Sequence, residues 1–233
     1  MIKISSIDGK NTIDFFCEED EFSGVKKIAD KVRKDVQLVT GTLPQIKQTL
    51  AECGEYAVVF GTVPKSGKFS LLAQKAGINV EELCAKREAY CFKIVDSIFE
   101  EKNIKSAIVI AGSDKRGTIY GLFHLSELLG VSPLVDWCNV LPVKKECVEL
   151  SEKDNFDSKE PSVRFRGFFI NDEWPAFGNW CTKNFGGVNA KMYEHVFELL
   201  LRLKGNYLWP AMWASRFSDD GPGLLNAELA DEL

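Results

Sequence analysis

Two short segments of this 233-residue chain carry side chains suited to chemistry on a sugar. The first, Asn171-Asp172-Glu173, places an amide and two carboxylates directly after the apolar residues 168–170. The second runs from Asn206 to Trp213 and also contains Trp209. Carboxylates can serve as acid or base, amides donate and accept hydrogen bonds, and aromatic rings offer flat apolar faces to a pyranose ring. These six residues are therefore candidates for binding a carbohydrate.

Each of these features also has an ordinary structural explanation. Two acids in a loop commonly cap a helix or form surface ion pairs. The tryptophans would equally close the mouth of a barrel or the junction between two domains. Asn206 follows Gly205 and fits a turn position. The sequence by itself leaves these alternatives open.

The surrounding pattern predicts how the two segments are brought together. Residues 163–170 and 206–213 are predicted strands, and residues 192–204 between them form an amphipathic helix. A strand–helix–parallel-strand connection crosses over right-handed, which puts both strand ends on one side. Asn171, Asp172 and Glu173 are then expected beside Trp209 and Trp213. Polar and aromatic side chains at the carboxyl ends of parallel strands are typical of the active face of a (β/α)8 barrel.

Residues 1–150 are predicted to form a separate, layered α/β domain. The continuous apolar runs 56–62 and 106–112 suit strands buried on both faces, and residues 115–129 form a helix with one apolar stripe. Residues 151–161 are charged and nearly free of apolar side chains, as a linker would be. Residues 162–233 then provide only the start of a barrel, since a whole one needs about 250 residues. The predicted fold class is α/β: an N-terminal layered α/β domain followed by the first βαβ unit of an incomplete (β/α)8 barrel.

One segment of this first domain imitates a phosphate-binding loop. Gly112 and Gly117 have the spacing of the G-x-x-x-x-G-K-[ST] motif, but Thr118 stands where the lysine belongs. Lys115 and Arg116 at a helix start could still meet an anion. We favour a tight strand-to-helix turn with Asp114 as the N-cap.

Composition excludes several other classes of function. The net charge is −5 without a basic stripe, which argues against a nucleic-acid partner, and no apolar run reaches the roughly 18 residues of a membrane span. The N-terminus lacks an apolar signal segment, so we expect a cytoplasmic protein, or a secreted one if a signal has been removed. The seven cysteines are odd in number and lack C-x-x-C spacing, which favours reduced thiols over disulfides or a zinc site. No metal and no cofactor is expected, and a homo-oligomer stays open.

Residues 166–173 together with residues 197–213 resemble glycoside hydrolase family 115, the xylan α-1,2-glucuronidases. The stretch 112–121 is also similar to the first domain of that family, so the resemblance spans essentially the whole chain. It implies hydrolase activity that removes (4-O-methyl-)glucuronic acid from glucuronoxylan or its oligosaccharides with inversion, which needs an acid and a base roughly 6.5–9.5 Å apart. It also implies that Asp172, Asn206, Trp209 and Trp213 line the pocket or bind the uronate.

The resemblance has limits within this chain. The general acid would fall on a later strand, beyond Leu233, so the catalytic residues are unknown and the chain alone is expected to be inactive. Around residues 133–140 the family tends to be richer in tryptophan and to carry an acid where Asn139 stands, which weakens any substrate role for that loop.

Two rival functions stay open at this level. One is another glycosidase with the same two-domain layout, such as a hexosaminidase-like enzyme, which would place an acidic pair on a later strand. The other is a non-catalytic carbohydrate-binding or assembly module, which would bind xylo-oligosaccharide without turnover.

Overall fold

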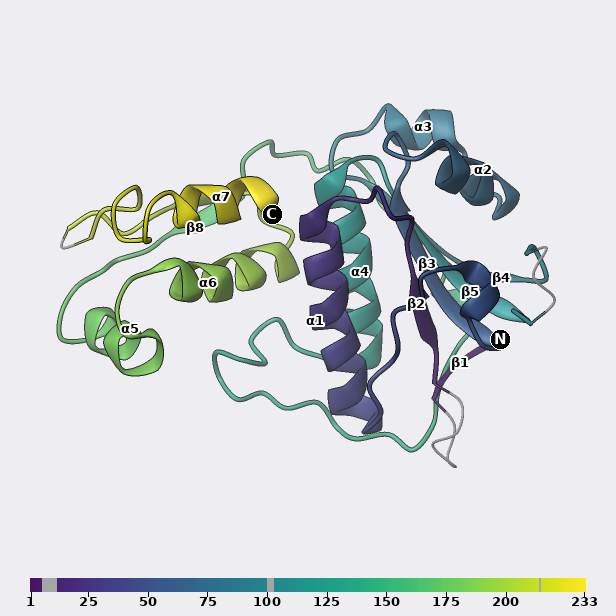
Figure 1. Cartoon of the computed structure of the whole chain (residues 1–233), viewed down its shortest axis with the longest axis horizontal. Coiled ribbons are helices and arrows are strands. Elements are labelled where there is room, and N and C mark those ends of the chain that lie inside the picture. The colour runs from purple at the N-terminus through teal and green to yellow at the C-terminus, as the bar shows by residue number, and fades with distance from the viewer. Residues whose placement is uncertain (6–11, 100–102, 214) are drawn as a thin grey trace. The chain divides into compact units, whose positions relative to one another are not determined.

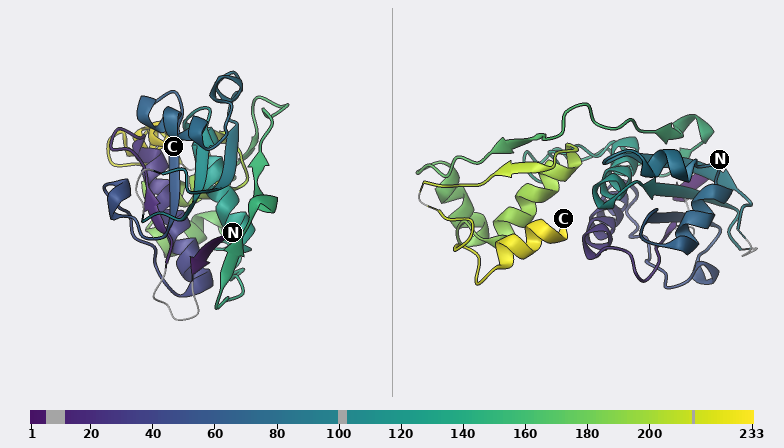
Figure 2. Two further views of the ribbon diagram at one scale, coloured as in Figure 1. Left: turned by 90° about the vertical axis from the view of Figure 1, so that its right-hand side faces the viewer. Right: turned by 90° about the horizontal axis from the view of Figure 1, so that it is seen from above.

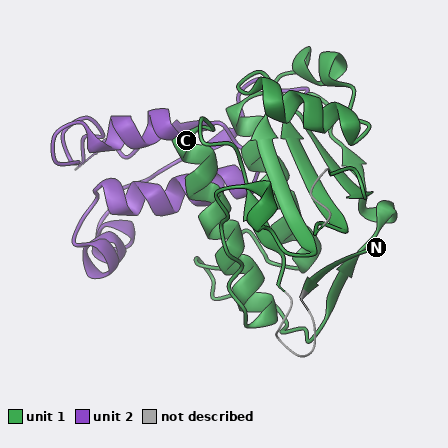
Figure 3. Ribbon diagram, turned by 45° about the vertical axis from the view of Figure 1, so that its right-hand side comes forward, with its two compact units in different colours: residues 1–161 green, residues 162–233 purple. Residues whose placement is uncertain are grey.

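The computed structural model describes residues 1–5, 12–99, 103–213 and 215–233 and contains two compact units, Met1–Pro161 and Ser162–Leu233 (Figure 3). The chain is mixed α/β, as its pattern of strands and helices predicts.

The first unit is built on a five-stranded sheet with the order β2-β3-β5-β4-β7 (Figure 1). Strands β2 (Asp14–Phe16), β3 (Tyr56–Thr62) and β5 (Ser106–Gly112) run parallel, and β4 (Tyr90–Asp96) lies antiparallel to β5. The apolar runs predicted to be central strands are β3 and β5, and they pair along their whole length from Tyr56↔Ser106 to Thr62↔Gly112.

Successive side chains of β3 and β5 point to opposite faces of the sheet, so both faces carry apolar side chains. Helices cover each face. Helices α1 (Ser23–Thr40) and α4 (Lys115–Leu129) pack side by side on one face (Figures 1 and 2). Helices α2 (Gly67–Lys75) and α3 (Val80–Cys84) contribute to the core of the other face, which the following buried side chains share: Val59, Phe69, Ala73, Leu83, Val109 and Ala111. Both faces of the central strands are therefore buried, as their unbroken apolar sequence requires.

The segment that imitates a phosphate loop is a capped turn. The Asp114 carboxylate accepts a hydrogen bond from the Gly117 N–H at 2.8 Å through one oxygen and from the Glu88 N–H at 2.8 Å through the other. The Arg116 guanidinium pairs with the buried Glu88 carboxylate at 2.8 Å. Asp114 is thus the N-cap that the sequence predicts, and Arg116 is held by a protein carboxylate.

The predicted linker, residues 151–161, is instead part of the first unit. Ser151 and Asp154 form a capping box around the short helix η2 (Glu152–Asp154), and β7 (Phe156–Asp157) pairs antiparallel with β4. The side chains of Asn155 and Ser158 accept hydrogen bonds from the backbone of β4, at Ile94 N and Tyr90 N. Polar residues look like a linker in sequence, but here they satisfy the outer edge of a sheet.

The first unit also contains a separate two-stranded sheet. Its strands β6 (Val148–Leu150) and β1 (Ile2–Ser5) pair antiparallel, with Ile2 opposite Leu150.

The second unit contains two parallel strands, β8 (Gly167–Phe169) and β9 (Tyr207–Trp209), paired from Gly167↔Tyr207 to Phe169↔Trp209. Between them lie α5 (Phe177–Phe185) and α6 (Ala190–Arg202), and α7 (Leu225–Glu232) follows β9 (Figure 1). Gly167 is required by close approach, because a Cβ there would overlap the carbonyl of Tyr207. The predicted strand–helix–strand unit is therefore present, with two helices in the connection rather than one.

Both strands are shorter than predicted. The Ile170 N–H still donates to the Trp209 carbonyl at 2.9 Å, which is the bond that closes the ladder at its carboxyl end. Helices α5 and α7 were not predicted. Among the described residues, no helix has the length and hydrophobicity needed to cross a membrane.

Candidate functional site

The carboxyl ends of β8 and β9 lie at the same edge of the strand pair, because the strands are parallel. Residues 170–176 leave β8 at this edge, and residues 210–213 leave β9 there. The structure joins the two segments directly: the backbone N–H of Trp213 donates to the two carboxylate oxygens of Asp172, at 3.0 and 3.1 Å. Two residues that the sequence singled out are thus neighbours in space although 41 positions separate them.

The Asp172 side chain lies beneath the surface, with the residue only 1% exposed. A buried carboxylate needs hydrogen-bond donors to offset its lost hydration, and the Trp213 N–H provides one. Asp172 therefore fixes the position of the segment that carries Trp213.

Asn171 and Glu173 flank this buried aspartate and are both exposed. Their amide and carboxylate are the groups of the Asn171–Glu173 motif that a solute can reach. An exposed carboxylate beside an amide is able to hold sugar hydroxyl groups.

The two predicted tryptophans are exposed as well. Trp213 is 72% exposed, and Trp209 is half-exposed with its ring packed edge-on against Phe169 at a centroid distance of 5.8 Å. Trp209 belongs to the face of the strand pair that also carries Phe165, Phe169 and Tyr207, all exposed.

Asn206 lies at the other end of the strands. Its Oδ1 accepts a hydrogen bond from the Arg166 N–H at 3.0 Å, and its Nδ2 donates to the Arg164 carbonyl at 2.8 Å. It precedes β9, whereas Asp172 follows β8, so the structure does not bring Asn206 to the other candidates. Residues at the amino ends of parallel strands usually serve stability rather than chemistry.

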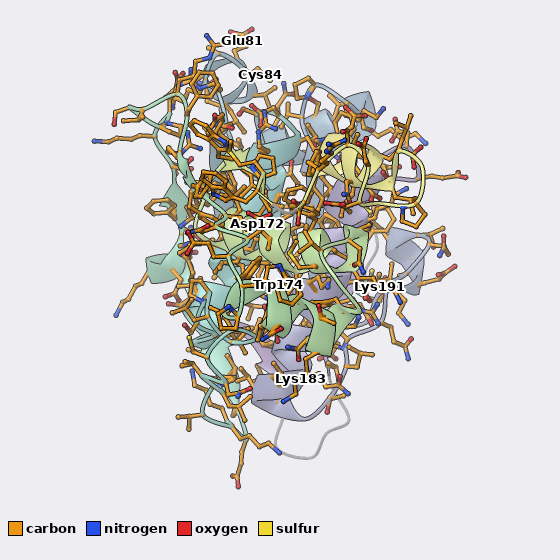
Figure 4. The ribbon with its side chains drawn as sticks, turned by 90° about the vertical axis from the view of Figure 1, so that its left-hand side faces the viewer. Glu81, Cys84, Asp172, Trp174, Lys183 and Lys191 are labelled. Atoms are coloured by element: carbon orange, nitrogen blue, oxygen red, sulfur yellow. The ribbon has the colours of Figure 1, made fainter. Side chains whose placement is uncertain are left out.

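Two further residues at this site were not among the sequence candidates. Trp174 directly follows Glu173 and is 55% exposed, and its position next to the motif was the available signal (Figure 4). Tyr193 on α6 is fully buried, and burial, reinforced by the negative charges of Asp220 and Asp172, raises the pKa of its phenol to about 12. Its hydroxyl therefore stays protonated, and in the sequence Tyr193 has only the helical spacing of a core residue.

The described residues contain no group of three His, Cys, Asp or Glu side chains placed to hold a metal ion. A cavity of about 240 Å³ lies in the first unit, between Cys17, Lys26, Lys47 and Phe60. Burial raises the pKa of the Cys17 thiol to about 12, so this cavity contains no reactive thiolate.

His195 on α6 packs against the rings of Phe185 and Trp180 on α5, at centroid distances of 5.5 and 6.1 Å. All seven cysteines are free in the structure.

The chain was compared with protein families and with solved structures. Residues 158–233 match the model of glycosyl hydrolase family 115. The whole chain superimposes on a solved family GH115 4-O-methyl-α-glucuronidase, BtGH115A, described as specific for decorated arabinogalactans, with a TM-score of 0.78 and 32% sequence identity. The chain spans 28% of the length of that protein. No protein with a curated description matches the chain.

Proposed function

The chain belongs to glycosyl hydrolase family 115, and from this premise we propose that it is the N-terminal portion of a glycoside hydrolase that removes (4-O-methyl-)glucuronic acid side chains from a plant polysaccharide. Glucuronoxylan and its oligosaccharides are the proposed substrates. The observation that carries the proposal is the bond between Asp172 and the Trp213 N–H, which gathers exposed polar and aromatic side chains at the carboxyl edge of two parallel strands.

The residues divide into two roles under this proposal. Asn171, Glu173, Trp209 and Trp213 are exposed and contact the sugar, Trp209 from the carboxyl end of β9 that the proposed barrel leaves open. Asp172 is buried and positions the Trp213 segment. Asn206 belongs to the framework, because both ends of its amide bind the backbone ahead of β8.

The exposed face of the strand pair supports a barrel. Phe165, Phe169, Tyr207 and Trp209 lie on it, and the rings contact each other across the strands, Phe165 with Tyr207 at 6.0 Å between centroids. Parallel strands are normally buried on both faces. We propose that further strands of the same polypeptide cover this face and complete a (β/α)8 barrel.

Inverting hydrolysis protonates the departing oxygen with one carboxyl group while a second carboxylate activates a water molecule on the opposite side of the sugar. We propose that the general acid lies on a later strand, beyond Leu233. Without that partner, Glu173 alone is able to orient a hydroxyl or a water molecule but cannot complete the reaction, so the 233-residue chain is expected to be inactive.

An assay of the polypeptide encoded by the complete open reading frame tests the proposal. Release of 4-O-methylglucuronic acid from glucuronoxylan is measured by anion-exchange chromatography, and the anomer formed first is identified by NMR. Release of the β-anomer by the longer polypeptide, with none by the 233-residue chain, is the expected result. Uronic acid released by the 233-residue chain alone would overturn the assignment of the missing acid.

Arabinogalactan is the second substrate to assay, because BtGH115A is described as specific for its decorated forms. Preferential release from arabinogalactan would keep the reaction and change the polysaccharide. Binding of either polysaccharide without turnover by the complete gene product would favour a non-catalytic binding module instead.

A further inference from the structure

We propose that Trp174 is a fixed aromatic platform on which a pyranose ring of the polysaccharide stacks, and that Gly178 is the residue that holds it in place. This inference rests on the proposed function and adds a binding residue to the same site.

The platform begins with a closed turn between β8 and α5. The N–H of Gly178 donates to the Glu173 carbonyl at 3.3 Å, and the Trp180 N–H donates to the Ala176 carbonyl at 3.2 Å. These two bonds tie residues 173–176 to the first turn of the helix. The backbone of Trp174 is therefore anchored at both ends.

The indole ring of Trp174 lies directly over Gly178. A Cβ at that position would overlap the ring-fusion atoms Cε2 and Cδ2 of the indole and come within 2.7 Å of its Nε1. Gly178 itself is buried, so the side chain that is missing there makes room for the ring. One face of the indole is thus supported by the helix backbone.

More than half of the Trp174 surface nevertheless stays exposed, at 55%. A large ring that is supported from behind and open in front is suited to binding, because little conformational entropy is lost when a ligand settles on it. The exposed Glu173 carboxylate and Asn171 amide come from the same loop and can accept hydrogen bonds from sugar hydroxyls. This combination of an apolar ring and polar acceptors matches a pyranose, which has an apolar face and polar edges.

Titration of the ¹⁵N-labelled 233-residue chain tests the proposal. Each of its five tryptophans gives one indole N–H signal, assigned by single Trp→Phe variants. Xylotriose is the first probe and galactotriose the second. We expect the Trp174 signal to shift with at least one probe, and Trp174→Ala to weaken the affinity by about tenfold, equivalent to about 1.4 kcal/mol.

Gly178→Ala keeps the indole ring of Trp174 but changes its position, so it tests whether that position determines the affinity. The added methyl group must displace the indole, so the affinity should fall nearly as far as with Trp174→Ala. The matched control is Gly67→Ala in α2, where an added Cβ has no atom within 4 Å. Trp174→Phe retains a ring and should stay within a few-fold of the unaltered chain, which guards against a loss caused by unfolding.

A shift of the Trp213 signal without one at Trp174 would overturn the platform and leave the proposed function standing. Absence of any indole shift with both probes would also overturn it. Conversely, a shift at Trp174 together with no uronic acid release by the complete gene product would keep the platform and overturn the proposed function.

Discussion

Asp172 is a buried carboxylate that joins the two segments of the candidate site. Its neighbours Asn171 and Glu173 face solvent, while its own oxygens accept the Trp213 N–H. An aspartate is needed at this position because its carboxylate accepts the Trp213 N–H in place of water. It thereby connects two loops that are distant in sequence.

Replacing Asp172 by alanine should destabilise the second unit by about 1–3 kcal/mol, since the Trp213 N–H loses its acceptor. Asp172→Asn keeps an oxygen acceptor and should lose less. Urea unfolding followed by tryptophan fluorescence measures the change, because Trp174, Trp180, Trp209 and Trp213 all belong to this unit. Asp219→Ala, at an exposed carboxylate of the same unit, is the control and should have little effect. Equal unfolding midpoints for Asp172→Ala and the control would contradict the assigned role.

Two partly buried thiols, Cys17 and Cys91, should resist alkylation. Burial raises the pKa of Cys17 from 9.0 to about 12, and burial together with the nearby Asp157 raises that of Cys91 to about 12. The thiolate is the reactive form, so at pH 8 its population falls about 1000-fold relative to a thiol of ordinary pKa. Iodoacetamide labelling followed by peptide mass spectrometry should modify the exposed Cys138 and Cys147 first.

Raising the pH increases the thiolate population, so labelling of Cys17 should rise roughly tenfold per pH unit while the fold persists. Labelling of Cys17 at the rate of Cys138 at pH 8 would show that the first unit opens around β2.

At the scale of elements, hydrogen bonds join the segments of β8 and β9 at both ends of the strand pair. Asp172 acts after the strands, and Asn206 acts before them by binding Arg164 and Arg166. Only the Asp172 contact should affect binding, because only the carboxyl edge of the strands carries the candidate binding residues.

Asn206→Ala should therefore lower stability without altering the site. Loss of two hydrogen bonds from a half-buried amide predicts about 1–2 kcal/mol of destabilisation, measured by the same urea unfolding. The Trp174 response to xylotriose should be unchanged at a temperature where the variant is folded. Asn184→Ala, which removes one exposed bond within α5, is the control. Loss of the xylotriose response in folded Asn206→Ala would instead indicate that Asn206 contributes to binding.

At the scale of the whole molecule, the exposed ring face of β8 and β9 is the main departure from an ordinary soluble surface. It contains Phe165, Phe169, Tyr207 and Trp209, and contiguous apolar patches of this kind mark interfaces or cause aggregation. The proposed barrel explains it by further strands that cover the face.

The 233-residue chain should accordingly bind a hydrophobic dye and self-associate. Phe169→Lys combined with Trp209→Lys places charge on the same face and should reduce both effects, with circular dichroism confirming that the fold is kept. Leu71→Lys, at an exposed apolar side chain of α2, is the matched control and should change neither. A monodisperse monomer that fails to bind the dye would contradict the idea that this face is normally covered.

Local sequence determined much of this protein. The unbroken apolar runs of β3 and β5 predict strands at the centre of a sheet, where both faces are buried. Asp114 caps α4 because its carboxylate lies three residues before the Gly117 N–H that it accepts. Residue type and strand-end position in the Asn171–Glu173 motif and the tryptophans likewise predicted a carbohydrate site, which stays a prediction.

Only the tertiary structure decided which of these side chains are free. Asp172 is buried because its carboxylate binds a backbone N–H that lies 41 residues further along the chain, whereas its neighbours stay exposed. Asn206 lies at the opposite edge of the strand pair because it precedes the first residue of β9. Residues 151–161 became part of a sheet because β4 left an edge to be satisfied. Such outcomes depend on partners distant in the chain, whereas periodicity and capping report only on near neighbours.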